Sequence, residues 1–394
     1  MESLRAQFPV LERIAYLNAG TNGPVPRRAL DAASESLRRQ AERGRGGKAF
    51  FEAFLGEADA LRSRAAGLLG CDRSELALTS STTDGVNAVL TALDLRRGDE
   101  VLTSDEEHPG VLAPLGVLRN RLGIKVRTAP FAELPGEVRP STRLVACSHV
   151  SWLTGRVMDT AALAGPGTRV LLDGAQGLGA VPVDVRSLGC DFYAASGQKW
   201  LCGPNGIGYL YARAELTGDL PAPWPGYQVL ADAARPLESE LHPDARRLAT
   251  GYPAPHDTAF AHAALDVLEE AGLERGQERA AALAARLADD LSERGVGVSP
   301  RDASTLVSFE IPDPPAFVER MEIEERIVVR ALPGTPFVRA SVGAWSSEKE
   351  VDRLVAVAAR AWRSQSSERS SSTSKIPSGP TESTNSSAVR RRSS

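Results

Sequence analysis

The chain has 394 residues, more than a single small hydrophobic core usually organises, so we expect two folded domains. Its 42% hydrophobic and 24% charged residues are typical of a soluble globular protein, and no apolar run approaches the roughly 18 residues of a membrane-spanning helix. The net charge of −4 gives no support for nucleic-acid binding. The N-terminus lacks the basic start and apolar stretch of a signal peptide, which favours a cytoplasmic location with no membrane partner.

Short apolar runs alternate with helical patterns between about residues 50 and 215. Strands are expected at 75–80, 99–104, 124–130, 143–151, 168–176, 190–196 and 206–212. Helices are expected between some of them, at 50–70, 82–93 and 110–123. Runs such as VLLD, residues 170–173, are apolar on both faces, as in parallel strands covered by helices. This alternation predicts an α/β layered domain with a mainly parallel sheet.

The pattern changes after about residue 252. A long amphipathic helical stretch is predicted at 253–295, followed by strands at 305–311, 327–334 and 337–343 and a last helix near 347–362. Such a mixture predicts a second, smaller α+β domain. From Gln365 onward the chain is rich in serine and nearly free of large apolar residues, so we expect a disordered tail. Its closing Arg390–Arg392 could touch nucleic acid or an acidic surface, although a plain solvated tail is the simpler interpretation.

Polar side chains follow the ends of three predicted strands. They are Asp173 and Gln176; Ser196, Gln198 and Lys199; and Ser81, Thr82 and Thr83 at the start of a predicted helix. Because ligands of an open parallel sheet bind beyond the carboxyl ends of its strands, these side chains are expected to share one site. Taken singly, each has an ordinary explanation: a carboxylate that caps a turn, a surface lysine, hydroxyls that cap a helix.

Taken together, these residue types match the needs of pyridoxal 5'-phosphate (PLP). A lysine amine forms a Schiff base with its aldehyde, and a carboxylate keeps its pyridine nitrogen protonated. A donor such as Gln176 can contact the phenolic oxygen, and hydroxyls with backbone N–H groups at a helix N-terminus can hold the phosphate. Lys199 stands among glycine, serine and apolar residues, where partial desolvation would lower the pKa of its amine as a Schiff-base lysine requires.

Other classes of function have weaker support. The five histidines and four cysteines form no HxxxH, HExxH or CxxC pattern, so we expect no metal site. The GLGAVPVD stretch at 177–184 contains GxG but lacks the third glycine of a dinucleotide-binding loop. A scaffold without catalysis would be expected to lose Lys199 or Asp173, and both are present.

The chain resembles the class V aminotransferase family of fold-type I PLP enzymes from about residue 8 to 363. The resemblance is carried by AYLNAGTNGPVP, LTSSTTDGVNAVL, SHVSWLTGRV, VLLDGAQGLGAVPVDV, FYAASGQKWLCGPNGIGYLY and FVRASVGAWSSEKEVDRLV. Within the family, EHPG, the tryptophan of SHVSWLTG and ATGYP are closest to the cystine C–S lyase branch, which is related to the cysteine desulfurases. The resemblance to this family implies a large domain with a mainly parallel seven-stranded sheet between helices and a smaller α+β domain. It also implies a homodimer with shared active sites. The implied segments are 1–14, packing with the small domain; 15–255, the large PLP-binding domain; 256–363, the small domain; and 364–394, the tail.

The resemblance also implies residue roles. Lys199 would carry the cofactor and shuttle a proton, Asp173 would pair with the pyridinium, and His108 would stack on the ring; these are the three expected catalytic residues. The other expected contacts to the cofactor are Gln176 at the phenolic oxygen and Ser81, Thr82, Thr83, Ser196, Gln198 and, from a second subunit, Thr250 at the phosphate. Arg339 would grip the substrate carboxylate with its bidentate fork. Trp152 and Asn22 are further candidates for the substrate pocket.

Three departures from the family pattern bear on the reaction. Gln198 stands where many relatives have histidine, and Trp152 where many desulfurases have asparagine. The segment VVRALPGTPFVRAS, residues 328–341, lacks the cysteine that desulfurases use. We therefore expect an amino-acid C–S lyase that releases pyruvate and ammonia from cystine or an S-substituted cysteine. Transamination, and after it epimerisation, are the alternatives.

Overall fold

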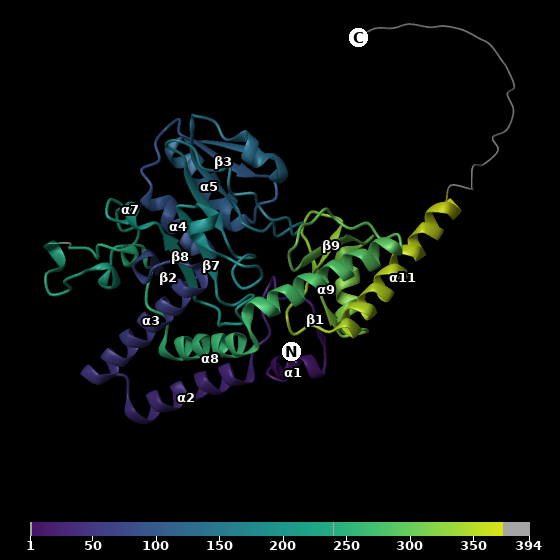
Figure 1. Cartoon of the computed structure of the whole chain (residues 1–394), viewed down its shortest axis with the longest axis horizontal. Helices are drawn as coiled ribbons and strands as arrows, with labels where there is room; N and C mark the ends of the chain where they lie inside the picture. Colours follow the sequence, from purple (N-terminus) through teal and green to yellow (C-terminus); the bar gives the residue numbers. More distant parts are fainter. Residues whose placement is uncertain (1, 239, 373–394) are drawn as a thin grey trace, which may run out of the picture.

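The computed structural model describes residues 2–238 and 240–372, which form a large part and a small part joined by long helices (Figure 1). The large part contains a seven-stranded sheet of order β2-β8-β7-β6-β5-β3-β4. Only β8 runs antiparallel to its neighbours, so the sheet is mainly parallel, as predicted. Its strands are β2 (Leu76–Thr79), β3 (Glu100–Ser104), β4 (Lys125–Ala129), β5 (Thr142–Ser148), β6 (Arg169–Asp173), β7 (Phe192–Ser196) and β8 (Gly208–Ala212).

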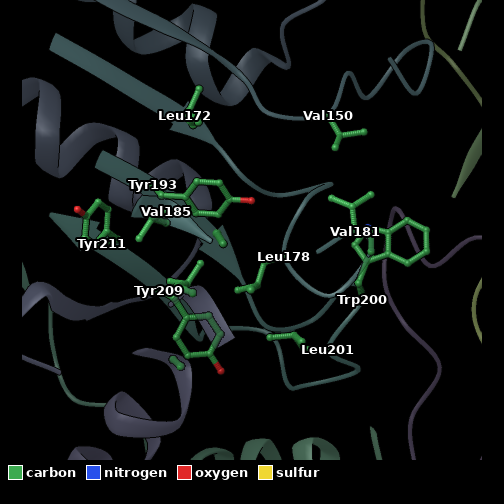
Figure 2. Close-up of a cluster of buried hydrophobic side chains, with 14 of the residues drawn as sticks. Val150, Leu172, Leu178, Val181, Val185, Tyr193, Trp200, Leu201, Tyr209 and Tyr211 are labelled. Atoms are coloured by element: carbon green, nitrogen blue, oxygen red, sulfur yellow. The ribbon is translucent and has the colours of Figure 1, made fainter. Parts of the chain in front are cut away.

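Both faces of this sheet are buried, which explains the apolar runs in the sequence. On β7, Phe192 and Ala194 pack into one core cluster and Tyr193 and Ala195 into the other, because successive side chains point to opposite faces. Figure 2 shows the second cluster, in which Tyr193, Tyr209 and Tyr211 extend from β7 and β8 on one side of Trp200. One face is covered by α4 (Thr82–Ala92) and α5 (Pro109–Leu122), the other by α3 (Lys48–Leu69) and α8 (Pro255–Ala271).

The small part is built around an antiparallel sheet of order β11-β12-β9. Its elements are β9 (Leu306–Glu310), α10 (Pro314–Ile323), β11 (Arg330–Ala331), β12 (Phe337–Ser341), α9 (Leu273–Glu293) and α11 (Glu348–Ser372). β1 (Ala15–Tyr16), which we expected to begin the large domain, pairs instead with β10 (Ile327–Val328), and Ala15 is buried in the small part's core. α11 extends to Ser372, so residues 364–372 continue a helix rather than the predicted disordered tail. The rest of that predicted tail, with Arg390–Arg392, lies outside the described residues.

The N-terminal segment contacts the small part. In α1 (Glu2–Arg5), Arg5 donates to the Glu350 carboxylate at 2.8 Å, and the Phe8 ring lies 5.0 Å from that of Trp345. Shorter elements complete the chain: α6 (Val185–Leu188), α7 (Ala214–Thr217) and the 3-10 helices η1 (Pro9–Glu12), η2 (Arg73–Glu75), η3 (Phe131–Glu137), η4 (Tyr227–Val229), η5 (Pro236–Glu238) and η6 (Ala245–Leu248). None of the described helices is long and apolar enough to cross a membrane.

Two helical features were not predicted from the sequence. α2 (Arg27–Arg43) packs along α8, but its buried residues, Ala29 and Ser36, are small and its leucines, Leu30 and Leu37, are exposed, so no run of large core residues marks it in the sequence. The stretch predicted as one helical segment at 253–295 is divided into α8 and α9 at Gly272. The φ of +82° at Gly272 is one that glycine adopts without steric cost.

Candidate active site

An open cavity of about 640 Å³ lies beyond the carboxyl ends of the central strands, between the large and small parts. Most of the residues that the sequence assigned to the site meet there. The cavity is lined by Gly20, Thr21, Ser81, Thr82, Thr83, His108, Trp152, Asp173, Ala175, Gln176, Ser196, Gln198, Lys199, Arg330 and Arg339.

Lys199 follows the end of β7 in a turn that is closed on both sides by backbone hydrogen bonds. The N–H of Gly197 donates to Ile207 O at 2.9 Å, and the N–H of Cys202 donates to Lys199 O at 3.1 Å. Burial lowers the pKa of the Lys199 amine to about 8, although the nearby Asp173 carboxylate opposes the shift. The turn therefore presents a lysine that is far more easily deprotonated than an exposed one, which is what covalent attachment to an aldehyde needs.

Asp173 is the last residue of β6 and is buried at the floor of the cavity. Its Oδ1 accepts a hydrogen bond from the N–H of Ala175 at 2.9 Å. Burial raises the pKa of this carboxyl, while the Lys199 ammonium and the Ala175 N–H favour its ionised form. A carboxylate so poorly solvated is suited to pair with a protonated ring nitrogen, because each charge lowers the cost of burying the other.

The Gln176 amide is fixed in orientation by two partners. Its Nε2 donates to Gly20 O at 2.8 Å, and its Oε1 accepts from Trp200 Nε1 at 3.0 Å. One N–H of Nε2 remains for another acceptor. This N–H is available to donate to the phenolic oxygen of the cofactor, the contact that the sequence predicts.

His108 and Trp152 form an aromatic pair at the cavity. Their ring centroids lie 5.1 Å apart with planes at 84°, an edge-to-face arrangement. His108 caps the N-terminus of α5, where its Nδ1 accepts the N–H of Gly110 at 3.0 Å. Burial, assisted by the Lys199, Arg330 and Arg339 cations, lowers the pKa of His108 to about 4. The imidazole is therefore neutral at physiological pH, with its proton on Nε2.

The N-terminus of α4 lies at the same cavity and is a candidate anion site. Ser81 is its cap residue, with Oγ accepting the N–H of Asp84 at 3.1 Å. Three buried polar atoms around this end have no hydrogen-bond partner among the described residues: Thr82 Oγ1, Ser196 Oγ and Gln198 Oε1. Buried hydroxyls are rarely left unpaired, and first-turn N–H groups attract an anion. These residues therefore fit a phosphate group, as predicted for PLP.

Arg339 is the largest fully buried side chain of the small part and reaches the cavity from β12. Its Nη1 donates to Trp152 O at 2.8 Å, while Nε and Nη2 are buried without a partner among the described residues. Burial, and then the neighbouring Arg330, lower the pKa of this guanidinium. An unpaired buried guanidinium edge of this kind is suited to bind a carboxylate in a fork-to-fork geometry.

Two predicted residues are not among those that line this cavity. The side chain of Thr250 donates to Asp84 Oδ2 of its own chain at 2.6 Å, and Asn22 is held through its carbonyl, which accepts from Tyr16 Oη at 2.9 Å. Gly20 and Thr21, just before Asn22, line the cavity instead. A side chain built on Gly20 would come within 3.0 Å of Arg339 Nη2, so this glycine allows the chain to approach the site closely.

Arg330 was missed by sequence reasoning. Its Nη1 donates to Thr21 Oγ1 at 3.1 Å, and its guanidinium carbon lies 6.0 Å from the centroid of the Trp152 ring. The signal that could have found it is its place in the predicted strand at 327–334, next to the strand that carries Arg339. Within residues 2–238 and 240–372, no three His, Cys, Asp or Glu side chains are grouped to hold a metal ion.

Comparison with known proteins agrees with this geometry. Residues 15–354 match the aminotransferase class-V family. A cysteine desulfurase from Klebsiella pneumoniae is 31% identical over 90% of this chain and 97% of its own length. The structure of the cystine C–S lyase C-DES with its product cysteine persulfide superposes with a TM-score of 0.84, at 29% identity over 90% of this chain and 99% of that one. A cysteine desulfurase from Escherichia coli gives 0.81, at 27% identity over 92% and 98% of the two chains.

These matches confirm the fold-type I architecture and the cofactor. A further C-DES structure carries glycine covalently linked to PLP, with a TM-score of 0.84 to this chain. The orphaned hydroxyls at α4, the buried Asp173 and the low-pKa Lys199 fit the same group. The chain therefore belongs to the class V aminotransferase family, in its cysteine desulfurase and cystine C–S lyase branch, and is a PLP-dependent enzyme.

Proposed function

We propose that this enzyme is a C–S lyase that acts on cystine or an S-substituted cysteine by β-elimination. The observation that carries the proposal is the combination of a complete PLP site with the absence of any cysteine from residues 328–341. β11 and β12 are joined there by a tight connection, in which Leu332 N donates to Phe337 O at 3.0 Å. No thiol is available in this segment to take sulfur from a substrate.

The remaining cysteines do not replace it. Cys202, the nearest in sequence to Lys199, is buried, and burial raises the pKa of its thiol well above the ordinary value. Cys147 and Cys190 are buried too, and Cys71 is half-buried with a thiol pKa of about 12, raised chiefly by burial. Because the thiolate is the nucleophile, none of the four is activated for persulfide formation.

The side chains of the site would divide the work of elimination. When bound, the cofactor supplies an electron-accepting ring that weakens the bonds to Cα. Arg339 would bind the substrate carboxylate through its free Nε and Nη2, and the Lys199 amine would take the Cα proton. The Cβ–S bond then breaks with its electron pair on sulfur, which leaves as a thiolate or persulfide. The three-carbon remainder is hydrolysed to pyruvate and ammonia.

Arg330 supports a substrate with a second anionic group. It lies in the same cavity, next to Arg339, and its guanidinium stands over Trp152. One guanidinium is enough for an α-carboxylate, so the second would face either a distal carboxylate or a leaving sulfur anion. Cystine offers both, which is why we favour it over an amino acid with an uncharged side chain.

We also propose a cytoplasmic homodimer with shared active sites. Large apolar side chains are exposed on α2, on α3 and on residues 218–254 between α7 and α8: Leu30, Leu37, Phe51, Trp224, Tyr227, Leu237 and Tyr252. Exposed apolar groups of this kind favour burial against a partner. Thr250 contacts Asp84 in the first turn of α4. If Thr250 also contributes to the phosphate site of a partner subunit, the two-fold axis of the dimer lies near this helix.

The decisive experiment is product analysis of the PLP-loaded enzyme. We would incubate it with cystine, cysteine and S-methylcysteine and measure pyruvate, ammonia and the sulfur product, with no keto acid added. Pyruvate and ammonia in equal amounts from cystine support the lyase. Amino transfer that depends on an added α-keto acid, without ammonia, would make it an aminotransferase, and inversion at Cα alone would make it an epimerase.

A further inference from the structure

One turn of the large part, Ser151–Gly155, lies between β5 and β6 in the sequence and carries Trp152 to the cavity. The hydroxyl oxygen of Ser151 accepts the N–H groups of Leu153 at 3.2 Å and Thr154 at 3.1 Å, and Ser151 O accepts the N–H of Gly155 at 3.0 Å. Gly155 has a φ of +83°, which a residue with a side chain would rarely adopt. The turn is therefore a compact unit, and its position depends on its contacts with side chains of the small part and of the rest of the large part.

The small part holds this turn through one row of its sheet and through Ser304, whose Oγ donates to Gly155 O at 2.6 Å. Ser308 on β9, Arg339 on β12 and Arg330 on β11 are successive cross-strand partners. Ser308 Oγ donates to Leu153 O, and Arg339 Nη1 donates to Trp152 O at 2.8 Å. The Arg330 guanidinium lies over the Trp152 ring at 6.0 Å. All three strands thus contact the same two residues of the turn.

In the large part, the Glu106 carboxylate holds the turn by hydrogen bonds, and the His108 ring packs against Trp152. Oε2 of Glu106 accepts hydrogen bonds from Ser151 Oγ and, at 2.6 Å, from Thr154 Oγ1. These two hydroxyls flank Trp152 in the sequence. Hydrogen bonds to an ionised acceptor are among the stronger ones, so Glu106 fixes both ends of the turn relative to the main sheet.

The position of Arg339 depends on this turn. Its guanidinium has one anchor, the Trp152 carbonyl, whereas Nε and Nη2 have no partner among the described residues. A shift of the turn would move the carbonyl and with it the free edge of the guanidinium. Displacements of about 1 Å at a positioning contact can cost up to about 100-fold in activity.

We propose that Glu106 is a positioning residue for recognition of the substrate carboxylate. Glu106 holds the Ser151–Gly155 turn, and the turn in turn fixes the position of the row Ser308, Arg339 and Arg330. The free edge of Arg339 is thereby oriented toward the substrate carboxylate. The inference rests on the proposed role of Arg339, and it assigns Glu106 no contact with substrate or cofactor.

The test compares two small amines that differ only in a carboxylate. Glycine and methylamine would each be titrated into the PLP-loaded enzyme, and the visible absorbance of the cofactor would give their apparent dissociation constants. The ratio of the two constants measures the preference for the carboxylate, independently of any turnover.

In Glu106→Leu we expect this preference to fall about tenfold or more, with methylamine affinity and cofactor content unchanged. In Glu106→Gln, whose amide oxygen can still accept both hydroxyls, we expect it to stay within about threefold of wild type.

Control variants separate this role from a general loss of structure. Glu319→Leu removes an exposed glutamate on α10, far from the turn in sequence, and should leave the ratio unchanged. Ser308→Ala and Thr154→Val each remove one hydroxyl that holds the turn, and they should lower the preference for glycine as Glu106→Leu does. These two variants replace Glu106→Leu in the test if that variant does not fold. An unchanged glycine preference in Glu106→Leu, or an equal loss of glycine and methylamine binding, overturns the proposal.

The same titration distinguishes failure of this inference from failure of the proposed function. If wild type shows no preference for glycine, or Arg339→Gln leaves that preference intact, the carboxylate role of Arg339 is wrong and the inference falls with it. If Arg339→Gln abolishes the preference and Glu106→Leu does not change it, only the inference about Glu106 is overturned.

Discussion

Arg330 and Arg339 are direct cross-strand partners in the antiparallel pair of β11 and β12. Like charges placed opposite each other in a sheet are destabilising, and here one of the two is fully buried. An anion between or beside the two guanidinium groups would remove this repulsion. We therefore interpret the hairpin as a binding site for an anionic substrate, in which the repulsion between the two arginines destabilises the folded protein until the anion binds.

Arg330→Gln tests this interpretation through substrate choice. Cystine has a second carboxylate and S-methylcysteine does not, so kcat/KM for cystine should fall about tenfold or more, while that for S-methylcysteine should change by much less. Steady-state pyruvate formation from both substrates gives the comparison. An equal fall in kcat/KM for the two substrates would mean that Arg330 maintains the structure of the site and does not bind a second anionic group of the substrate.

Lys199→Ala should abolish turnover and covalent attachment of the cofactor. Among the residues that line the cavity, Lys199 is the only lysine. After borohydride reduction, mass spectrometry of wild-type peptides should find the cofactor on Lys199, and the variant should carry none at this site. The α4 hydroxyls remain in the variant, so free PLP should still bind with measurable affinity. A reduced adduct at a lysine other than Lys199 in the wild type, or turnover by the variant, would contradict the assignment.

The sheet and the polar side chains at its strand ends were predictable from the sequence because local signals specify them. VLLD and FYAAS are apolar on both faces, and Asp173 and Ser196 end them. Thr21 and Arg330 carried no such signal, because they meet only when the N-terminal segment and the small part fold onto the large one. α2 was missed for a different reason, since the residues that it buries against α8 are small and its leucines are exposed.

Asp173→Asn keeps the shape of the side chain and removes its charge. The amide oxygen can still accept the Ala175 N–H, so the turn after β6 should be retained. Without the carboxylate, the ring nitrogen of the cofactor is no longer held protonated, and the rate should fall well over tenfold, which is more than about 1.4 kcal/mol of barrier. Cofactor content and single-turnover rates should be measured together. A variant within about tenfold of wild type would argue against this role for Asp173.

The pH dependence of cofactor capture should report the lowered pKa of Lys199. Only the neutral amine attacks an aldehyde, so the rate at which the apoenzyme captures PLP should rise with pH and level off near the pKa of about 8. An ordinary lysine would level off only near about 10.4. His108 should not contribute, because its pKa of about 4 keeps it neutral throughout this range. Stopped-flow absorbance between about pH 6 and about pH 10 measures the profile, with free lysine as the reference amine.

The thiols should be dispensable for turnover, which separates this enzyme from one that carries a persulfide. Cys71 is the only cysteine that is not fully buried, and its pKa of about 12 leaves almost no thiolate at neutral pH. Treatment with iodoacetamide at about pH 7.5 should therefore leave cystine cleavage unchanged, and Cys71→Ser should match wild type in rate and in sulfur product. Intact-protein mass spectrometry during turnover should find no sulfur added to the chain. Inactivation by iodoacetamide that Cys71→Ser prevents, together with a mass increase of one sulfur atom in wild type, would instead establish a desulfurase route through this residue.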